Sequence, residues 1–126
     1  MKRVALLVAM VLICLGCRNK LRHAKEQVLQ EDLFTMRQSI DQFTQDQKRA
    51  PEKLDDLVAH GYIRAIPIDP FTNSQLTWQV VYQDFTPPPQ DTPALPPQEI
   101  RQLRGIVDVH SGSDQIAIDG TRYKDW

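Results

Sequence analysis

Three residues near the C-terminal end have the side-chain types of a hydrolytic triad: Asp108, His110 and Ser111. In such a triad the histidine must lie within hydrogen-bond reach of both the acid and the nucleophile. On a strand followed by a turn, residues 108 and 110 share one face, whereas Ser111 points away. The chain has no G-x-S-x-G elbow, and no second acid or oxyanion loop is evident. The pattern therefore predicts that this protein is not an enzyme.

The other residues that could bind a metal or undergo redox chemistry are also poorly spaced for it. The three histidines are dispersed; we expect His23 and His60 to be solvent-exposed and His110 to bond its own backbone in a turn. Cys14 and Cys17 have C-x-x-C spacing, but no histidine follows for haem attachment and no second pair completes a zinc site. The sequence thus predicts no haem, zinc or thiol redox centre.

The first 17 residues have the pattern of an export signal or membrane anchor. Met1-Lys2-Arg3 is a short positive segment, and an uncharged run of fourteen residues follows from Val4 to Cys17. As a helix this run would rise roughly 21 Å, which is short against a hydrocarbon core of about 30 Å. More basic residues follow the run, between Arg18 and Lys25, than precede it, which weakens a permanent span. A cleaved or lipidated leader is therefore favoured.

Residues 13–17, Ile-Cys-Leu-Gly-Cys, resemble a bacterial lipoprotein signal, in which a cysteine after a small residue is lipidated and becomes the new N-terminus. This resemblance implies lipidation of Cys17 and a place in the bacterial cell envelope. The alternative is that Cys14 and Cys17 are only apolar leader residues.

Length and charge limit the remaining function classes. Removal of the leader leaves about 110 residues, which is enough for one small domain over residues 18–126. The formal net charge is −1, and the one basic cluster, Arg18 to Lys25, is placed next to the membrane. We therefore expect no nucleic-acid partner. We also expect no small-molecule substrate.

Apolar residues at helical spacing predict a long amphipathic helix over about residues 21–46. A helix of this length would extend roughly 39 Å, so its first turns should project and only the later stripe should pack on the rest. Phe34 is expected in the core together with that stripe. We expect the stripe to be the assembly helix as well, and it consists of Leu29, Leu33, Met36, Ile40 and Phe43.

The head, over about residues 50–126, is predicted to combine a short helix with a small sheet. Pro51 suits a first helical turn and Gly61 a helix end, and the prolines between Tyr62 and Phe71 impose a rigid non-helical connection. Strands are expected at Leu76–Tyr82, Ile106–Val109 and Gln115–Ile118. Six prolines between Pro87 and Pro97 indicate an extended surface loop, and Glu99–Leu103 a helical turn. The fold class is α+β, with a long N-terminal helix packed on a small antiparallel sheet.

This order of features resembles the major pseudopilin of type II secretion systems and related type IV pilin-like proteins. The resemblance rests on Ala50–Val58, Gly61-Tyr62-Ile63, the Ile-Pro-x-Asp-Pro series from Ile66 to Phe71, a strand with Trp78, and the terminal Asp125-Trp126. It implies a structural subunit that self-associates, or joins other pilin-like subunits, through its helix. Such filaments are anchored in the membrane with their heads in the periplasm, and they serve protein export or form a pilus.

The resemblance also implies a calcium site in the C-terminal loop, because these subunits commonly hold Ca²⁺ there through carboxylate and backbone oxygens. The oxygen donors in the matching region are Ser111, Ser113, Asp114, Asp119 and Asp125. The same residues are also ordinary turn formers, so turn chemistry is the alternative.

The leader departs from the family. It lacks the glycine cleavage point and the glutamate that, in pseudopilins, is expected to pair with the amine of a neighbouring subunit. A second interpretation is therefore a free-standing lipid-anchored periplasmic lipoprotein with a pilin-like head.

Overall fold

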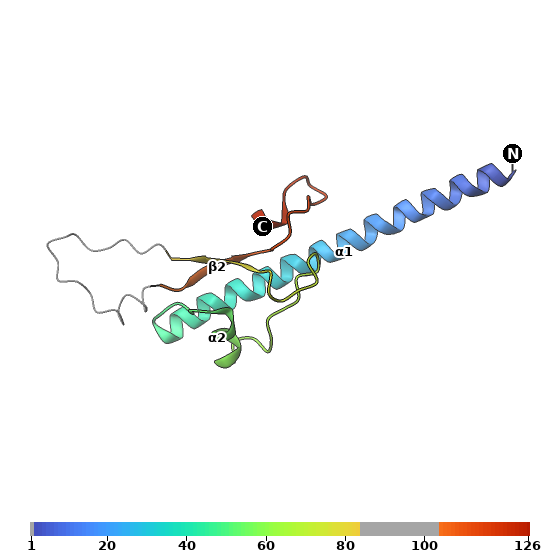
Figure 1. The fold of residues 1–126 in the computed structure, drawn as a ribbon. Coiled ribbons are helices and arrows are strands. Elements are labelled where there is room, and N and C mark those ends of the chain that lie inside the picture. Colours follow the sequence, from blue (N-terminus) through green and yellow to red (C-terminus); the bar gives the residue numbers. More distant parts are fainter. Residues whose placement is uncertain (1, 84–103) are drawn as a thin grey trace.

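The computed structural model describes residues 2–83 and 104–126, with side chains from Arg18 onward. It has one long helix, a short second helix and a two-stranded antiparallel sheet, and is thus α+β as predicted. Helix α1 (Lys2–Gln47) is continuous, and it extends beyond the head at its N-terminal end (Figure 1). It stops where Lys48 adopts a left-handed conformation with φ of 55°.

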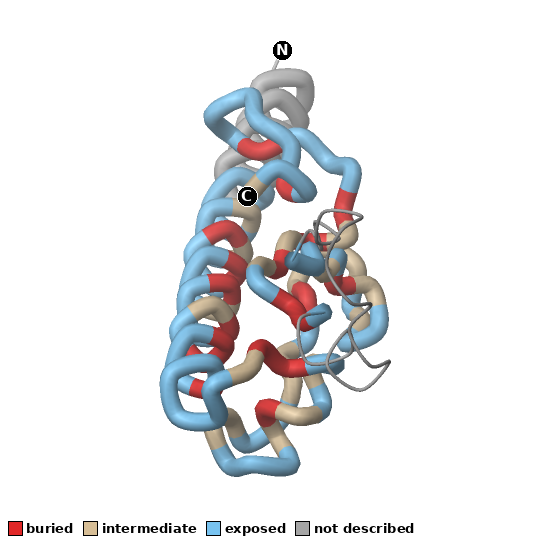
Figure 2. Tube along the Cα trace, turned by 90° about the vertical axis from the view of Figure 1, so that its left-hand side faces the viewer, coloured by how far each residue is buried: buried red, intermediate tan, exposed pale blue. Residues whose placement is uncertain are grey.

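One face of α1 forms one side of the hydrophobic core. Buried residues recur along this face, as the red segments of the tube in Figure 2 show, and the head lies against it. From the head, Ile106 and Val109 of the sheet and Leu57 of the second helix complete the same cluster. The long helix is therefore stabilised by burial of its apolar stripe.

Helix α2 (Leu54–Ala59) begins later than its sequence predicts. Pro51 precedes the helix instead of occupying its first turn. The Asp56 carboxylate accepts hydrogen bonds from the backbone N–H groups of Glu52 and Lys53, at 2.9 and 3.0 Å, and this satisfies the chain just before the helix. Pro51 contributes its carbonyl, which accepts a 2.7 Å hydrogen bond from Ile106 N–H. At the other end Gly61 has φ of 78°, which confirms the predicted glycine stop.

The sheet consists of β1 (Gln79–Tyr82) and β2 (Ile106–His110), paired antiparallel with Val80 opposite Val109. Two of the three predicted strands are thus present, although β1 is shorter than predicted. The predicted loop at Pro87–Pro97 and helical turn at Glu99–Leu103 lie outside the described residues.

The third predicted strand, Gln115–Ile118, is not formed. This segment instead folds back on the chain end, where Tyr123 N–H donates to the Gln115 carbonyl at 3.1 Å and Ala117 N–H to the Thr121 carbonyl at 2.7 Å. The Asp119-Gly120 turn shortens the pairing to one isolated bridge, between Ile116 and Arg122. The chain ends in a short 3-10 turn, η1 (Tyr123–Asp125).

Candidate functional site at the seam between α1 and the head

The five residues predicted to form the assembly helix lie inside the protein's own core. Each is at most 2% exposed, and they are Leu29, Leu33, Met36, Ile40 and Phe43. Phe43 also contacts the aromatic rings of His60 and Tyr62, with ring centroids 5.1 and 5.4 Å apart. Any assembly through α1 must therefore use side chains outside this stripe.

Other apolar residues of α1 remain exposed. Phe34, which the sequence placed in the core, is 66% exposed. Successive helical residues are rotated by about 100°, so Leu33 faces the head while Phe34 points to its side. Leu21 is 63% and Val28 49% exposed; they are seven residues apart and so share a face. Between Arg18 and Gln47, these are the large apolar side chains of α1 that are exposed.

Nearer the N-terminus the seam is held by polar contacts around Glu26, which is only 6% exposed. Its Oε1 atom accepts a 2.7 Å hydrogen bond from the Tyr123 hydroxyl and a 2.8 Å hydrogen bond from Ile118 N–H. Arg22 donates from Nε to the same hydroxyl at 3.2 Å and from Nη2 to the Ile116 carbonyl. Burial raises the pKa of Tyr123 above its ordinary value, so this hydroxyl keeps its proton for Glu26.

A second polar contact joins α1 to β2. Arg37 Nε donates to Asp108 Oδ1 at 2.6 Å, and Arg37 Nη2 donates to the Val109 carbonyl at 2.9 Å and to the Trp126 carbonyl. Burial disfavours the charge of Asp108, but the hydrogen bonds from Arg37 and Val109 N–H, with the nearby charges of Arg37 and His110, outweigh it. The pKa of Asp108 therefore lies below its ordinary value.

The three residues of triad type do not form a triad. Asp108 and His110 share a face as predicted, with Oδ2 and Nε2 3.4 Å apart. His110 is the last residue of β2, not a turn residue, and its buried Nδ1 has no hydrogen-bond partner among the described residues instead of the predicted backbone bond. The Ser111 hydroxyl donates to Asp69 Oδ2 at 2.6 Å. Ser111 thus bonds to the loop that contains Asp69, beside the sheet.

Asp69 is a fully buried carboxylate that fastens two loops together. Its Oδ1 accepts from Phe71 N–H at 2.8 Å within the turn that follows it. Its Oδ2 accepts from Ser111 and from Gly112 N–H, the latter at 3.2 Å. A Cβ on Gly112 would lie 2.1 Å from the Thr77 carbonyl oxygen, so only glycine allows this approach.

No protein-family model, curated protein or solved structure matches this chain. Among the described residues, no helix combines the length and apolar character needed to cross a membrane. Cys17 lies in α1, but its side chain is outside the described residues, so its lipidation stays a prediction.

Four of the five residues predicted to bind calcium have separate hydrogen-bond or ion-pair partners. Ser111 donates to Asp69, and Ser113 Oγ accepts from Gln115 N–H at 3.3 Å. Asp114 pairs with Lys124 Nζ at 2.7 Å, Asp119 accepts from Thr121, and Asp125 lies exposed in η1. In residues 18–83 and 104–126 no three His, Cys, Asp or Glu side chains gather as metal ligands. Calcium binding stays a prediction.

Sequence reasoning missed the two buried carboxylates, Glu26 and Asp69. Glu26 carries no local signal, because its partners are about a hundred positions further along the chain. Asp69 does carry a local sequence signal, because it stands before proline in the rigid segment from Ile66 to Phe71. In such a turn an acidic side chain commonly accepts hydrogen bonds from the next backbone N–H groups.

Proposed function

We propose that this protein is a pilin-like structural subunit of a type II secretion or pilus-type filament. It is anchored at a membrane of the bacterial cell envelope, with its head in the periplasm, and takes part in protein export through helix-mediated assembly. It is a structural protein, not an enzyme. The observation that carries the proposal is α1 itself, a single helix from Lys2 to Gln47 in which, from Arg18 onward, the first buried residue is Glu26.

Such a helix suits lateral assembly because its packed and unpacked parts have separate roles. The stripe from Leu29 to Phe43 fixes the head to the helix and leaves no apolar side chain on that face for a neighbour. Leu21 and Val28 lie on another face, exposed and one above the other, where a second helix can pack on them. The assembly face therefore includes Leu21 and Val28.

The test places a photoreactive amino acid at position 28 of the full chain, expressed in the membrane of a bacterial host. The matched control carries it at Gln30, which is also exposed but lies about 200° around the helix. We expect cross-linked dimers and higher species from position 28 and mainly monomer from position 30. Monomer at both positions, or equal cross-linking at both, would argue against the assembly face.

The second candidate, a free-standing lipoprotein, is favoured by Gly16-Cys17 and by the missing leader glutamate. Mass spectrometry of the mature N-terminus separates the two. A diacylated Cys17 would exclude processing as an ordinary pseudopilin, whereas an intact leader in the membrane would exclude the lipoprotein.

A further inference from the structure

The head-facing stripe of α1 does not stay apolar along its whole length. The sequence of positions that carries Leu29, Leu33 and Met36 continues toward the N-terminus, at intervals of four and three residues, through Lys25, Arg22 and Arg18. At 3.6 residues per turn all of these share one face. Three cations thus occupy the positions where packing against the head would favour apolar residues.

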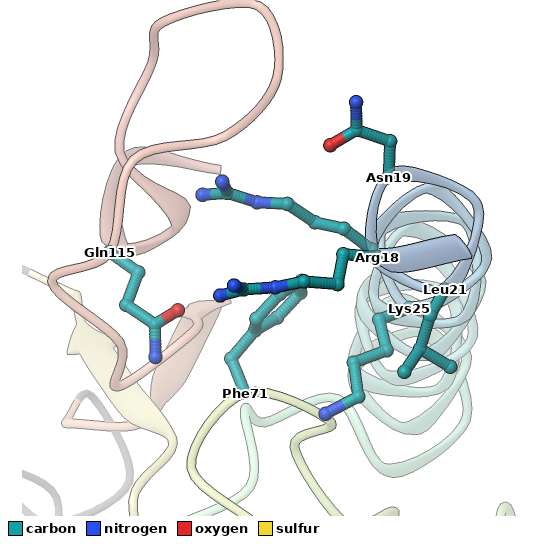
Figure 3. Close-up of a pocket in the computed structure, with 7 residues that line it drawn as sticks. Arg18, Asn19, Leu21, Lys25, Phe71 and Gln115 are labelled. Atoms are coloured by element: carbon teal, nitrogen blue, oxygen red, sulfur yellow. The ribbon is translucent and has the colours of Figure 1, made fainter. Parts of the chain in front are cut away.

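These cations border a cleft of about 440 Å³ between α1 and the head, a volume typical of small-ligand sites. Phe71 and Gln115 line its far side. Figure 3 shows two arginine side chains, one of them the labelled Arg18, extending from α1 toward the head, with Phe71 and Gln115 on the opposite side of the cleft. None of the described residues that line the cleft is acidic.

The structural role of the cations leaves most of their donors unused. Arg22 donates to the Tyr123 hydroxyl and the Ile116 carbonyl, and Lys25 Nζ to the Pro70 carbonyl at 3.1 Å. A guanidinium has five N–H donors and an ammonium three, so both can bind a further acceptor. Arg18 has no hydrogen-bond or ion-pair partner in the described part of the chain. Arg22 and Lys25 are therefore held in place by hydrogen bonds to the head, and Arg18 lies beside them with its donors available to a ligand.

We propose that this cleft binds the phosphate of an anionic phospholipid headgroup, with Arg18, Arg22 and Lys25 as its ligands. Guanidinium groups bind phosphate oxygens through paired hydrogen bonds, and the ammonium adds a point charge. The proposal rests on membrane attachment at residues 1–17 but not on filament assembly.

The position of the cleft along the chain selects a lipid as the source of the phosphate. The uncharged run ends at Cys17, so Arg18 and Arg22 lie roughly 2 and 8 Å beyond it along the helix. The headgroup layer is roughly 5–7 Å thick on each side of a bilayer. A retained leader and a lipidated Cys17 both put Arg18 at headgroup depth and Arg22 at the outer edge of the headgroup layer.

The experiment uses the full chain in neutral detergent and follows thermal unfolding of the head by near-ultraviolet circular dichroism. Short-chain phosphatidylglycerol is titrated in, with short-chain phosphatidylcholine and inorganic phosphate as separate arms. A ligand that binds only the folded head raises the melting temperature with its concentration. We expect phosphatidylglycerol to raise it at concentrations where the other two do not.

The deciding variant is Arg18→Gln, because Arg18 makes no hydrogen bond or ion pair within the part of the chain that the structure describes. Lys20→Gln is the matched control: it also removes one exposed cation, but from a position about 200° around the helix from Arg18. We expect Arg18→Gln to weaken the apparent affinity about tenfold, as the loss of one charge-assisted contact implies, and Lys20→Gln to leave it unchanged. Equal loss in both variants, or no loss in Arg18→Gln, would overturn the proposal. An equal response to phosphatidylcholine or inorganic phosphate would overturn the lipid as its ligand.

Discussion

The two halves of the seam between α1 and the head use the same helix face in opposite ways. From Leu29 to Phe43 the face is apolar and fully packed, whereas from Arg18 to Glu26 it carries charges, of which Arg22, Lys25 and Glu26 reach the head by hydrogen bonds. Apolar contact is non-directional and follows the area removed from water. Hydrogen bonds of charged side chains to neutral partners depend on geometry, and they leave donors free for a ligand. We infer that the first half supplies stability and the second half orientation at the membrane.

The largest expected effect lies in the apolar half, at Phe43. We expect Phe43→Ala to lower the free energy of unfolding by about 3–5 kcal/mol, because it removes a fully buried ring and leaves a cavity. The measurement is urea unfolding of the full chain in detergent, followed by tryptophan fluorescence.

Phe34→Ala is the control, since it removes the same ring from an exposed position on the same helix. Its cost should stay within about 0.5 kcal/mol. Similar losses for both variants would mean that the packed face of α1 is wrongly assigned.

The next largest effect tests the polar half through Glu26. Glu26→Ala removes the acceptor of the Tyr123 hydroxyl and of Ile118 N–H, so two donors at the seam lose their partner. We expect a loss of about 1–3 kcal/mol in the same unfolding measurement, which is less than for Phe43→Ala. Glu31→Ala, at an exposed position of α1, should change little. If Glu26→Ala is as mild as Glu31→Ala, the C-terminal segment is not held by this carboxylate.

The contrast between the halves also explains what the sequence could predict. The apolar stripe could be predicted because its period of 3.6 residues is local information. All five of its residues, from Leu29 to Phe43, lie in the core as expected. Phe34 was misplaced because a bulky aromatic next to the stripe is not distinguished from it by hydropathy alone. The two strands of the sheet followed from short apolar runs between turn residues.

The polar contacts along the whole seam could not be predicted, because they join residues far apart in the chain. Glu26 and Tyr123 are separated by 97 positions and Arg37 and Asp108 by 71, and no local pattern links them. The prediction of a strand at Gln115–Ile118 was wrong for a related reason. Its apolar residues satisfy a strand pattern, but its backbone bonds to the chain end go to Thr121 and Tyr123, and Ile116 and Ile118 stay exposed.

The smallest effect concerns the ion pair of Arg37 and Asp108, and it appears as a dependence on pH. The folded pKa of Asp108 lies below the ordinary value of 3.8, so its contribution is present above that pH and is lost as pH falls through the folded pKa. Because the Asp108 side chain is 38% exposed, solvent screening keeps this contribution below about 1 kcal/mol.

Arg37→Met should destabilise the protein at every pH, because the hydrogen bonds to two carbonyls are lost. The gap in the free energy of unfolding between this variant and the unmodified chain should nevertheless narrow below about pH 4. Asp114 and Asp119 also have lowered pKa values, so only this gap between the two proteins isolates Asp108. Arg64→Met, at an exposed position of the head, should show a constant gap. A constant gap for Arg37→Met as well would mean that Arg37 holds β2 through the Val109 and Trp126 carbonyls alone.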